Sequence, residues 1–174
     1  MTERVMVDIE TLGREPGCVI VSISAVRFGY GIKDELGLDV APTSCQRAGL
    51  DIDAETLAWW LTQGEAARSQ LLGGQPLAEA LDELASFIPA ENKEVWAKSP
   101  AFDLAILEAA FEAVGQPTPW EFYETRDVRT IVNLECAVDI DHQGIEHDAV
   151  DDARFQARQV GETLMHIDAE VGDE

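Results

Sequence analysis

The sequence predicts an α/β domain in which helices cover a mixed β-sheet. Three segments with strand-like patterns come first and would form a meander. Helical segments then alternate with short strand-like segments, an order that is typical of such domains. The chain has 174 residues, the length of one ordinary domain, and no repeat, linker or low-complexity segment divides it. We therefore expect residues 1–174 to form a single domain.

Alternation and turn residues predict the three N-terminal strands. Residues 4–11 alternate between an apolar face and a face that carries two carboxylates. A turn over 13–17 leads to a second strand over 18–28, which is rich in valine and isoleucine. The glycine-containing stretch 29–31 predicts a hairpin turn, and a third strand is expected over 35–40.

The middle of the chain is expected to be mainly helical. Asp53 is a favoured N-cap for one helix, and Pro76 opens another. A short strand is predicted over 94–97. Ser99 is a favoured N-cap for the next helix, which runs to about residue 114 and stops at Gly115.

Two further helices complete the predicted fold. One is expected over 127–137, and a polar loop follows it over 139–146. The last helix should begin near Asp148 and run past Met165. Its apolar stripe recurs at alternating intervals of three and four residues, at Val150, Ala153, Ala157, Val160, Leu164 and Ile167.

The composition excludes several classes of protein. A hydrophobic fraction of 46% is typical of soluble globular chains, and no apolar run is long enough to cross a membrane. The N-terminus leads into a strand-like segment instead of a signal peptide. The three cysteines, Cys18, Cys45 and Cys136, lie far apart and predict no disulfide framework. We therefore expect a protein of the reducing cytoplasm.

The charge balance is strongly acidic. The chain carries 34 acidic and 12 basic residues, a net charge of −22, and only Lys33, Lys93 and Lys98 are lysines. Such self-repulsion destabilises a compact state at low salt and is screened at high salt. The pattern favours a protein that works in high intracellular salt, as in a halophile, over an ordinary acidic protein. It excludes broad adhesion to nucleic acid but allows a local site bridged by metal ions.

Two carboxylates interrupt the first predicted strand. Asp8 and Glu10 are two residues apart, so both side chains point to one face of the strand. Adjacent carboxylates repel each other unless a cation lies between them, and Mg²⁺ prefers carboxylate oxygens and water. A chain this acidic also contains such pairs by chance, as at Asp139 and Asp141.

Two more segments supply candidates for the same site. Asp103 lies in the first turn of the helix after the strand 94–97, where a carboxylate also suits the helix dipole. In the segment 147–153, Asp148 and Asp151 are explained as capping residues. Asp152 has no such role, and His147 precedes the helix and is free to project over a site.

Three segments together resemble the motifs of the DEDDh 3′–5′ exonucleases. Val-Met-Val-Asp8-Ile-Glu10-Thr-Leu-Gly resembles the first motif, and residues 95–107 are similar to the second. The pattern H-x-A-x-x-D-A over 147–153 resembles the third. Further segments at 55–61, 65–68 and 126–130 resemble the small phage and bacterial branch related to RNase T, which is often labelled exonuclease-VIII-like. A viral protein of this kind would work in the host cytoplasm.

The resemblance implies an RNase H-like fold with a five-stranded mixed sheet, and phosphodiester hydrolysis with two Mg²⁺ or Mn²⁺ ions. By motif, Asp8 bridges both ions, and Asp103 supports one of them through water. Glu10 and Asp152 hold the ion that activates the attacking water. His147 is the general base that takes the proton of that water.

The resemblance also suggests residues that contact the substrate. The candidates are Thr11, Leu12, Phe102, Trp60 and Arg129. A tryptophan that stacks on a base contributes about 1–3 kcal/mol. Trp59 and Trp60 are adjacent on a predicted helix and face different ways, so at most one of them should stack; packing in the core is the alternative for both. Arg129 would contact phosphate or form an ion pair.

The substrate stays open between single-stranded DNA, which we slightly favour, and RNA. A catalytically silent nucleic-acid-binding relative is a further alternative, and a homodimer is possible. Glycoside hydrolysis by paired carboxylates would leave His147 and Asp152 unexplained. An EF-hand beginning at Asp139 is excluded because its twelfth position is Val150, where a bidentate glutamate is needed.

Overall fold

The structure is a computed structural model that describes residues 2–141 and 149–172. Five strands form one sheet in the order β3-β2-β1-β4-β5. Their bounds are β1 (Glu3–Thr11), β2 (Ile20–Phe28), β3 (Ile32–Asp39), β4 (Lys93–Ala97) and β5 (Thr125–Asp127). The first three strands pair antiparallel, whereas β1–β4 and β4–β5 are parallel. The predicted five-stranded mixed sheet is therefore confirmed.

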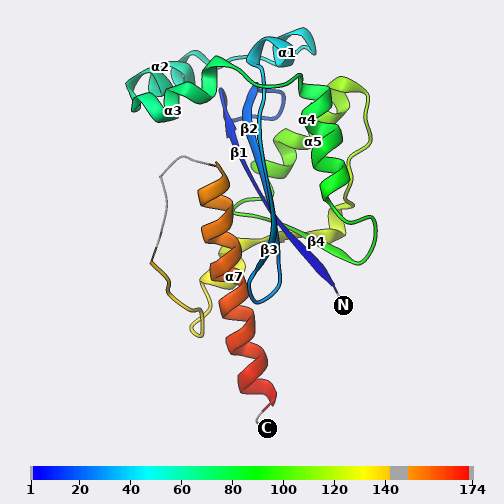
Figure 1. Ribbon diagram of the computed structural model, residues 1–174, viewed down its shortest axis with the longest axis vertical. Helices are drawn as coiled ribbons and strands as arrows, with labels where there is room; N and C mark the ends of the chain where they lie inside the picture. The colour runs from blue at the N-terminus through cyan, green and yellow to red at the C-terminus, as the bar shows by residue number, and fades with distance from the viewer. Residues whose placement is uncertain (1, 142–148, 173–174) are drawn as a thin grey trace.

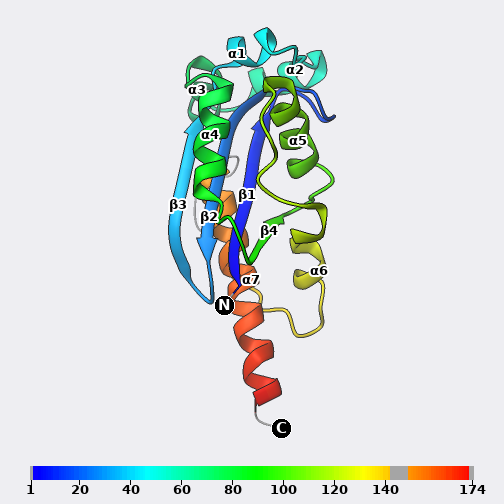
Figure 2. The same ribbon diagram turned by 90° about the vertical axis from the view of Figure 1, so that its right-hand side faces the viewer.

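Helices lie on both faces and at one end of the sheet (Figures 1 and 2). Their bounds are α1 (Pro42–Arg47), α2 (Ala54–Thr62), α3 (Glu65–Ser69), α4 (Leu77–Phe87), α5 (Asp103–Val114), α6 (Val128–Val132) and α7 (Ala149–Gly172). Two short 3-10 turns cover Gln70–Leu72 and Phe122–Glu124. Figure 1 shows α1, α2 and α3 at the end of the sheet toward which β1 runs. No helix of the described residues is long and apolar enough to cross a membrane.

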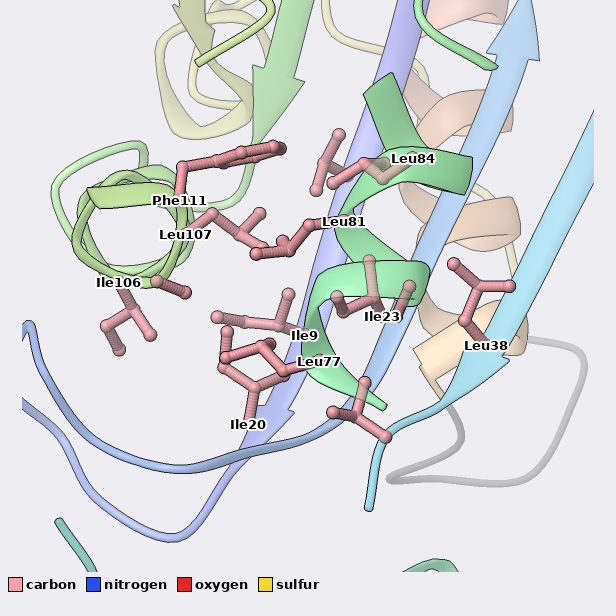
Figure 3. Close-up of a cluster of buried hydrophobic side chains, with 14 of the residues drawn as sticks. Ile9, Ile20, Ile23, Leu38, Leu77, Leu81, Leu84, Ile106, Leu107 and Phe111 are labelled. Carbon is pink, nitrogen blue, oxygen red and sulfur yellow. The ribbon is translucent and has the colours of Figure 1, made fainter. Parts of the chain in front are cut away.

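The alternation of β1 separates two hydrophobic cores. Val5, Val7 and Ile9 belong to the larger core, which packs against α4 and α5 (Figure 3). Met6 belongs to the smaller core, which lies beneath α7. Asp8 and Glu10 continue the Met6 face, because side chains of a strand alternate between its faces. The two carboxylates therefore lie on the α7 side of the sheet, at the carboxyl end of β1.

Several predicted element boundaries are confirmed by local contacts. The side chain of Asp53 accepts a hydrogen bond from the Thr56 amide at 2.7 Å and so caps α2. Gly115 ends α5 in the left-handed region, with φ of 73°, where glycine has no steric penalty. The stripe along α7 is buried at Ala153, Ala157 and Val160, as its spacing predicts.

Other boundaries differ from the prediction. Helix α5 begins at Asp103, because the carbonyl of Ser99 first closes a turn by accepting from the Phe102 and Asp103 amides. The helix predicted over 127–137 shortens to α6, where β-branched residues have lower helix propensity. Strand β5 was not predicted, because its three residues are polar and its pairing with β4 is the only feature that marks it.

Candidate active site

Three carboxylates from two elements meet at one end of the sheet. Asp8 and Glu10 come from the end of β1, and Asp152 comes from the first turn of α7. One ligand oxygen from each residue lies within 4.8 Å of the others. The strand alternation of β1 and the position of α7 across the sheet bring the three side chains together. In the sequence they are far apart, because Asp151 lies 141 positions after Glu10 and Asp152 is the next residue.

The electrostatics at Asp8 are those of an unneutralised acidic cluster. Burial raises the pKa of Asp8 well above its ordinary value, and the charges of Asp103, Glu10 and Asp152 raise it further. A hydrogen bond from the Gln156 side chain acts in the opposite direction. The folded chain therefore places Asp8 where a positive charge would be strongly favoured.

Asp103 is the fourth carboxylate of the site. Its side chain is buried, with 6% exposed, and burial raises its pKa to about 6. Backbone hydrogen bonds from Asp103 itself, Ile9 and Ser99 oppose this shift, as does the charge of Arg129. The contact with the Ile9 backbone places Asp103 against β1, beside the group of three carboxylates.

The donor set fits a hard divalent cation. Carboxylate oxygens are the ligands that Mg²⁺ and Mn²⁺ prefer, and a bound cation removes the mutual repulsion of the acidic groups. The predicted ligands Asp8, Glu10 and Asp152 form the group itself, and Asp103 lies next to it.

The third motif is divided between described and undescribed residues. His147 and Asp148 lie outside the described residues, so the predicted general base and the predicted cap stay predictions. Asp151 and Asp152 have different partners. Asp151 accepts a hydrogen bond from Arg154, which also pairs with Glu35 at 2.7 Å, whereas Asp152 belongs to the carboxylate group.

A pocket of about 450 Å³ lies beside the carboxylates. Its lining includes Glu10 and Thr11 from the end of β1, Trp59 and Trp60 from α2, and Phe102. Thr11 is itself mostly buried, and its hydroxyl donates to the carbonyl of Gly13 at 2.6 Å. Trp59 is the open aromatic surface of this wall, with 42% of the residue exposed.

Two of the residues predicted to contact the substrate are buried. Trp60 is only 1% exposed, and its indole nitrogen donates to the carbonyl of Thr11 at 2.8 Å, so it holds α2 against β1. Leu12 is 3% exposed and packs in the larger core, so its contact with a base stays a prediction. Leu12 lies next to the first motif and Trp60 lies next to Trp59, but position in the sequence alone does not show which way each side chain points.

Arg129, which is predicted to contact phosphate, has different surroundings from its neighbour Arg126. Arg126 pairs with Glu94 at 3.4 Å. Arg129 is exposed at the start of α6 and donates to the carbonyl of Lys98, and its charge acts on Asp103. Arg129 therefore lies at the edge of the site.

Sequence reasoning missed Gln156, whose amide contacts Asp8 at 2.9 Å. The signal was its position four residues after Asp152, which places both side chains on one face of α7. It also left open which tryptophan is accessible, which only burial decides.

The chain matches the model of the family described as the 3′–5′ exoribonuclease Rv2179c-like domain over residues 3–164. No curated protein sequence matches the chain significantly.

Solved structures of exonucleases share the fold. E. coli exonuclease I in complex with a dT13 oligonucleotide has a TM-score of 0.70 at 13% identity, over 99% of this chain and 43% of that chain. The nuclease domain of 3′hExo, a DEDDh family member bound to rAMP, has a TM-score of 0.63 at 12% identity, over 94% and 92%. Exonuclease I from Methylocaldum szegediense has a TM-score of 0.59 at 12% identity, over 98% and 41%.

These similarities fix the fold as that of the RNase H-like DEDDh exonucleases. The chain spans less than half the length of the exonuclease I structures, and most of the length of the 3′hExo nuclease domain. The match over residues 3–164 shows that this chain belongs to the Rv2179c-like 3′–5′ exoribonuclease domain family.

Proposed function

We propose that the protein removes nucleotides from the 3′ end of single-stranded RNA with two divalent metal ions. The observation that carries the proposal is the group of Asp8, Glu10 and Asp152 beside a pocket with an exposed tryptophan. The family description favours RNA over the DNA that the sequence alone slightly favoured.

The carboxylates would hold the metal ions. Asp8, Glu10 and Asp152 would bind one ion, and Asp103 with Asp8 would support a second. When bound, such a pair of ions supplies an activated water and a Lewis acid that stabilises the leaving oxygen. His147, by its place in the third motif, would take the proton from the attacking water.

The pocket beside the carboxylates would hold the terminal nucleoside. Trp59, 42% of which is exposed, would stack on a base, a contact that contributes about 1–3 kcal/mol for each base. Thr11 and Phe102 would form the remaining wall. Arg129, which is exposed and acts electrostatically on Asp103, would contact a phosphate.

A second candidate function is hydrolysis of single-stranded DNA. The observation that favours it is the fold shared with exonuclease I bound to dT13. Because exonucleases that act on DNA and RNA use the same carboxylates, a contact to the 2′-hydroxyl would have to separate them.

A time course on 5′-labelled RNA and DNA of one sequence, with Mg²⁺ or Mn²⁺, tests both candidates. The parent chain should shorten the RNA from its 3′ end, and Asp8→Ala should not. Faster shortening of DNA would support the second candidate. Cleavage of neither strand at low or high KCl would contradict both, and would favour a silent nucleic-acid-binding relative.

The acidity of the chain supports two narrower proposals. A net charge of −22 suits a protein that works at high salt, as in a halophile or its virus. The acidic surface repels nucleic acid, and the metal ions at the carboxylates would then attract it locally. A cytoplasmic location, membership of the phage-type branch and a homodimer stay predictions.

A further inference from the structure

A glutamine lies beneath the carboxylate group. Gln156 is on α7, four residues after Asp152, and is 4% exposed. Its Nε2 atom donates to Oδ1 of Asp8 at 2.9 Å. Among the described residues, no other protein group donates to the Asp8 carboxylate, so Oδ2 is left for another ligand.

This glutamine is unfavourable for packing. Its Oε1 atom is buried and has no hydrogen-bond partner among the described residues. A buried polar atom without a partner destabilises the folded state. The neighbouring α7 positions that face the sheet are small and apolar, at Ala153, Ala157 and Val160. An apolar residue at 156 would suit this face better, so its contact with Asp8 explains the glutamine.

Strand β2 provides a second polar group at the same place. Ser24 is fully buried, and its hydroxyl also lacks a partner among the described residues. Ser24 pairs directly with Asp8 in the antiparallel register, so their side chains share one face of the sheet. Neutral polar groups from α7 and β2 therefore lie at Asp8, in addition to the carboxylates of the site.

We propose that Gln156 is a positioning residue that sets the orientation of the Asp8 carboxylate for metal binding. The amide fixes one oxygen and leaves the other for the ion. Because the amide is neutral, it orients the carboxylate and leaves the negative charge that attracts the ion. An arginine or lysine in this place would cancel that charge. This inference rests on the metal-dependent function proposed above and adds a residue to it.

The test measures Mn²⁺ binding by titration calorimetry on the metal-free chain, without nucleic acid. Gln156→Met keeps the length of the side chain and removes the donor, and Gln156→Asn keeps an amide that is too short to reach Asp8. Outer-shell partners of metal ligands typically contribute about 10–100-fold to metal affinity. Both variants should weaken Mn²⁺ binding by about that factor.

Gln159→Met is the matched control, because it makes the same change on the same helix one turn away. It should bind Mn²⁺ like the parent. Circular dichroism of each metal-free variant verifies that it is folded. A second readout is the cleavage rate, which in Gln156→Met should recover as Mn²⁺ is raised, because the defect lies in ion binding.

The outcomes separate this inference from the proposed function. Parent and Gln156→Met with equal Mn²⁺ affinity would overturn the positioning role and leave the metal site intact. An equal loss in Gln159→Met would overturn it also, because the effect would then belong to the helix. A parent chain that binds no Mn²⁺ would overturn the metal-dependent function and this inference with it.

Discussion

At the scale of single residues, neighbouring side chains have different roles. Asp151 pairs with Arg154, and Asp152, the next residue, completes the carboxylate group. One residue along a helix turns a side chain by about 100°, so adjacent residues cannot face one site together. The same reasoning separates Trp59 from Trp60, of which the first is 42% exposed and the second 1%.

We expect Asp152→Ala and Asp151→Ala to give opposite results. Asp152 is a proposed metal ligand, so the effect of its loss should exceed the about 100-fold that outer-shell changes reach. Loss of Asp151 removes an ion pair with a partly exposed arginine, worth about 0–1 kcal/mol, and should keep most activity. Initial rates of RNA shortening measure both. Loss of activity in Asp151→Ala alone would show that the third motif is in another register.

We expect substitutions of the two tryptophans to change different properties, substrate binding for Trp59 and stability for Trp60. Trp59→Ala should raise KM by an amount that reflects the loss of about 1–3 kcal/mol of stacking, with Tm nearly unchanged. Trp60→Ala should lower stability by about 3–5 kcal/mol, since it empties a buried site. Steady-state kinetics and thermal unfolding measure the two effects. An unchanged KM in Trp59→Ala would remove Trp59 from the nucleotide pocket.

The buried carboxyl group of Asp103 should make the stability of the metal-free chain depend on pH. Its pKa is about 6 in the folded chain against an ordinary 3.8, so the folded state holds the proton more tightly than the unfolded chain. The resulting stabilisation, roughly 3 kcal/mol, is present below about pH 4 and is lost as pH rises through about 6. Metal-free Tm should therefore fall over this range.

Asp103→Asn isolates this contribution, because asparagine does not titrate. The fall in metal-free Tm with rising pH should be smaller in Asp103→Asn than in the parent. Asp82→Asn, which changes an exposed carboxylate on α4, should keep the parent slope. Equal slopes in Asp103→Asn and the parent would show that burial of Asp103 is not linked to stability.

At the scale of elements, the sequence predicted best where a pattern is long. The alternation of β1 and the apolar stripe of α7 predicted both elements, whereas the meeting of Asp8, Glu10 and Asp152 was implied by the resemblance of their motifs. Strand β5 and helix α6 are too short to carry a period. Gln156 contacts Asp8 across 148 positions of the chain, a contact that only the packing of α7 on β1 creates.

Close packing of α7 on the sheet depends on glycines. A Cβ at Gly161 would lie 2.7 Å from the carbonyl oxygen of Gly29, in the hairpin between β2 and β3. A Cβ at Gly37 on β3 would lie 2.6 Å from Val150 at the start of α7. The small residues let the helix lie close enough to bring Asp152 to β1.

Gly161→Ala should therefore destabilise the fold although alanine is the better helix former. The clash with a backbone carbonyl should cost about 1–3 kcal/mol, more than the about 1 kcal/mol that alanine gains in a helix. Gly64→Ala is the control, because nothing lies within 4 Å of the Cβ it adds. Thermal unfolding measures both. A higher Tm in Gly161→Ala would show that α7 can move away from the hairpin without loss.

At the scale of the whole molecule, the charge cannot be balanced internally. Even if each of the 12 basic residues paired with one carboxylate, 22 of the 34 acidic residues would remain unpaired. Ion pairs such as that of Lys93 with Glu124, at 3.2 Å, already engage some of the few basic side chains. The folded state therefore concentrates repulsion that the expanded unfolded chain relieves.

Salt should raise the stability of this chain. Between about 0.1 M and about 1 M KCl, the Debye length falls from about 10 Å to about 3 Å, which screens repulsion between surface carboxylates more than it weakens short ion pairs. We expect Tm to rise over this range, and to rise equally with NaCl, because screening depends on ionic strength and not on the cation. Thermal unfolding of the metal-free chain in both salts measures the effect. A Tm that falls with KCl would mean that ion pairs such as Arg154 with Glu35 outweigh the net repulsion, and would contradict an adaptation to high salt.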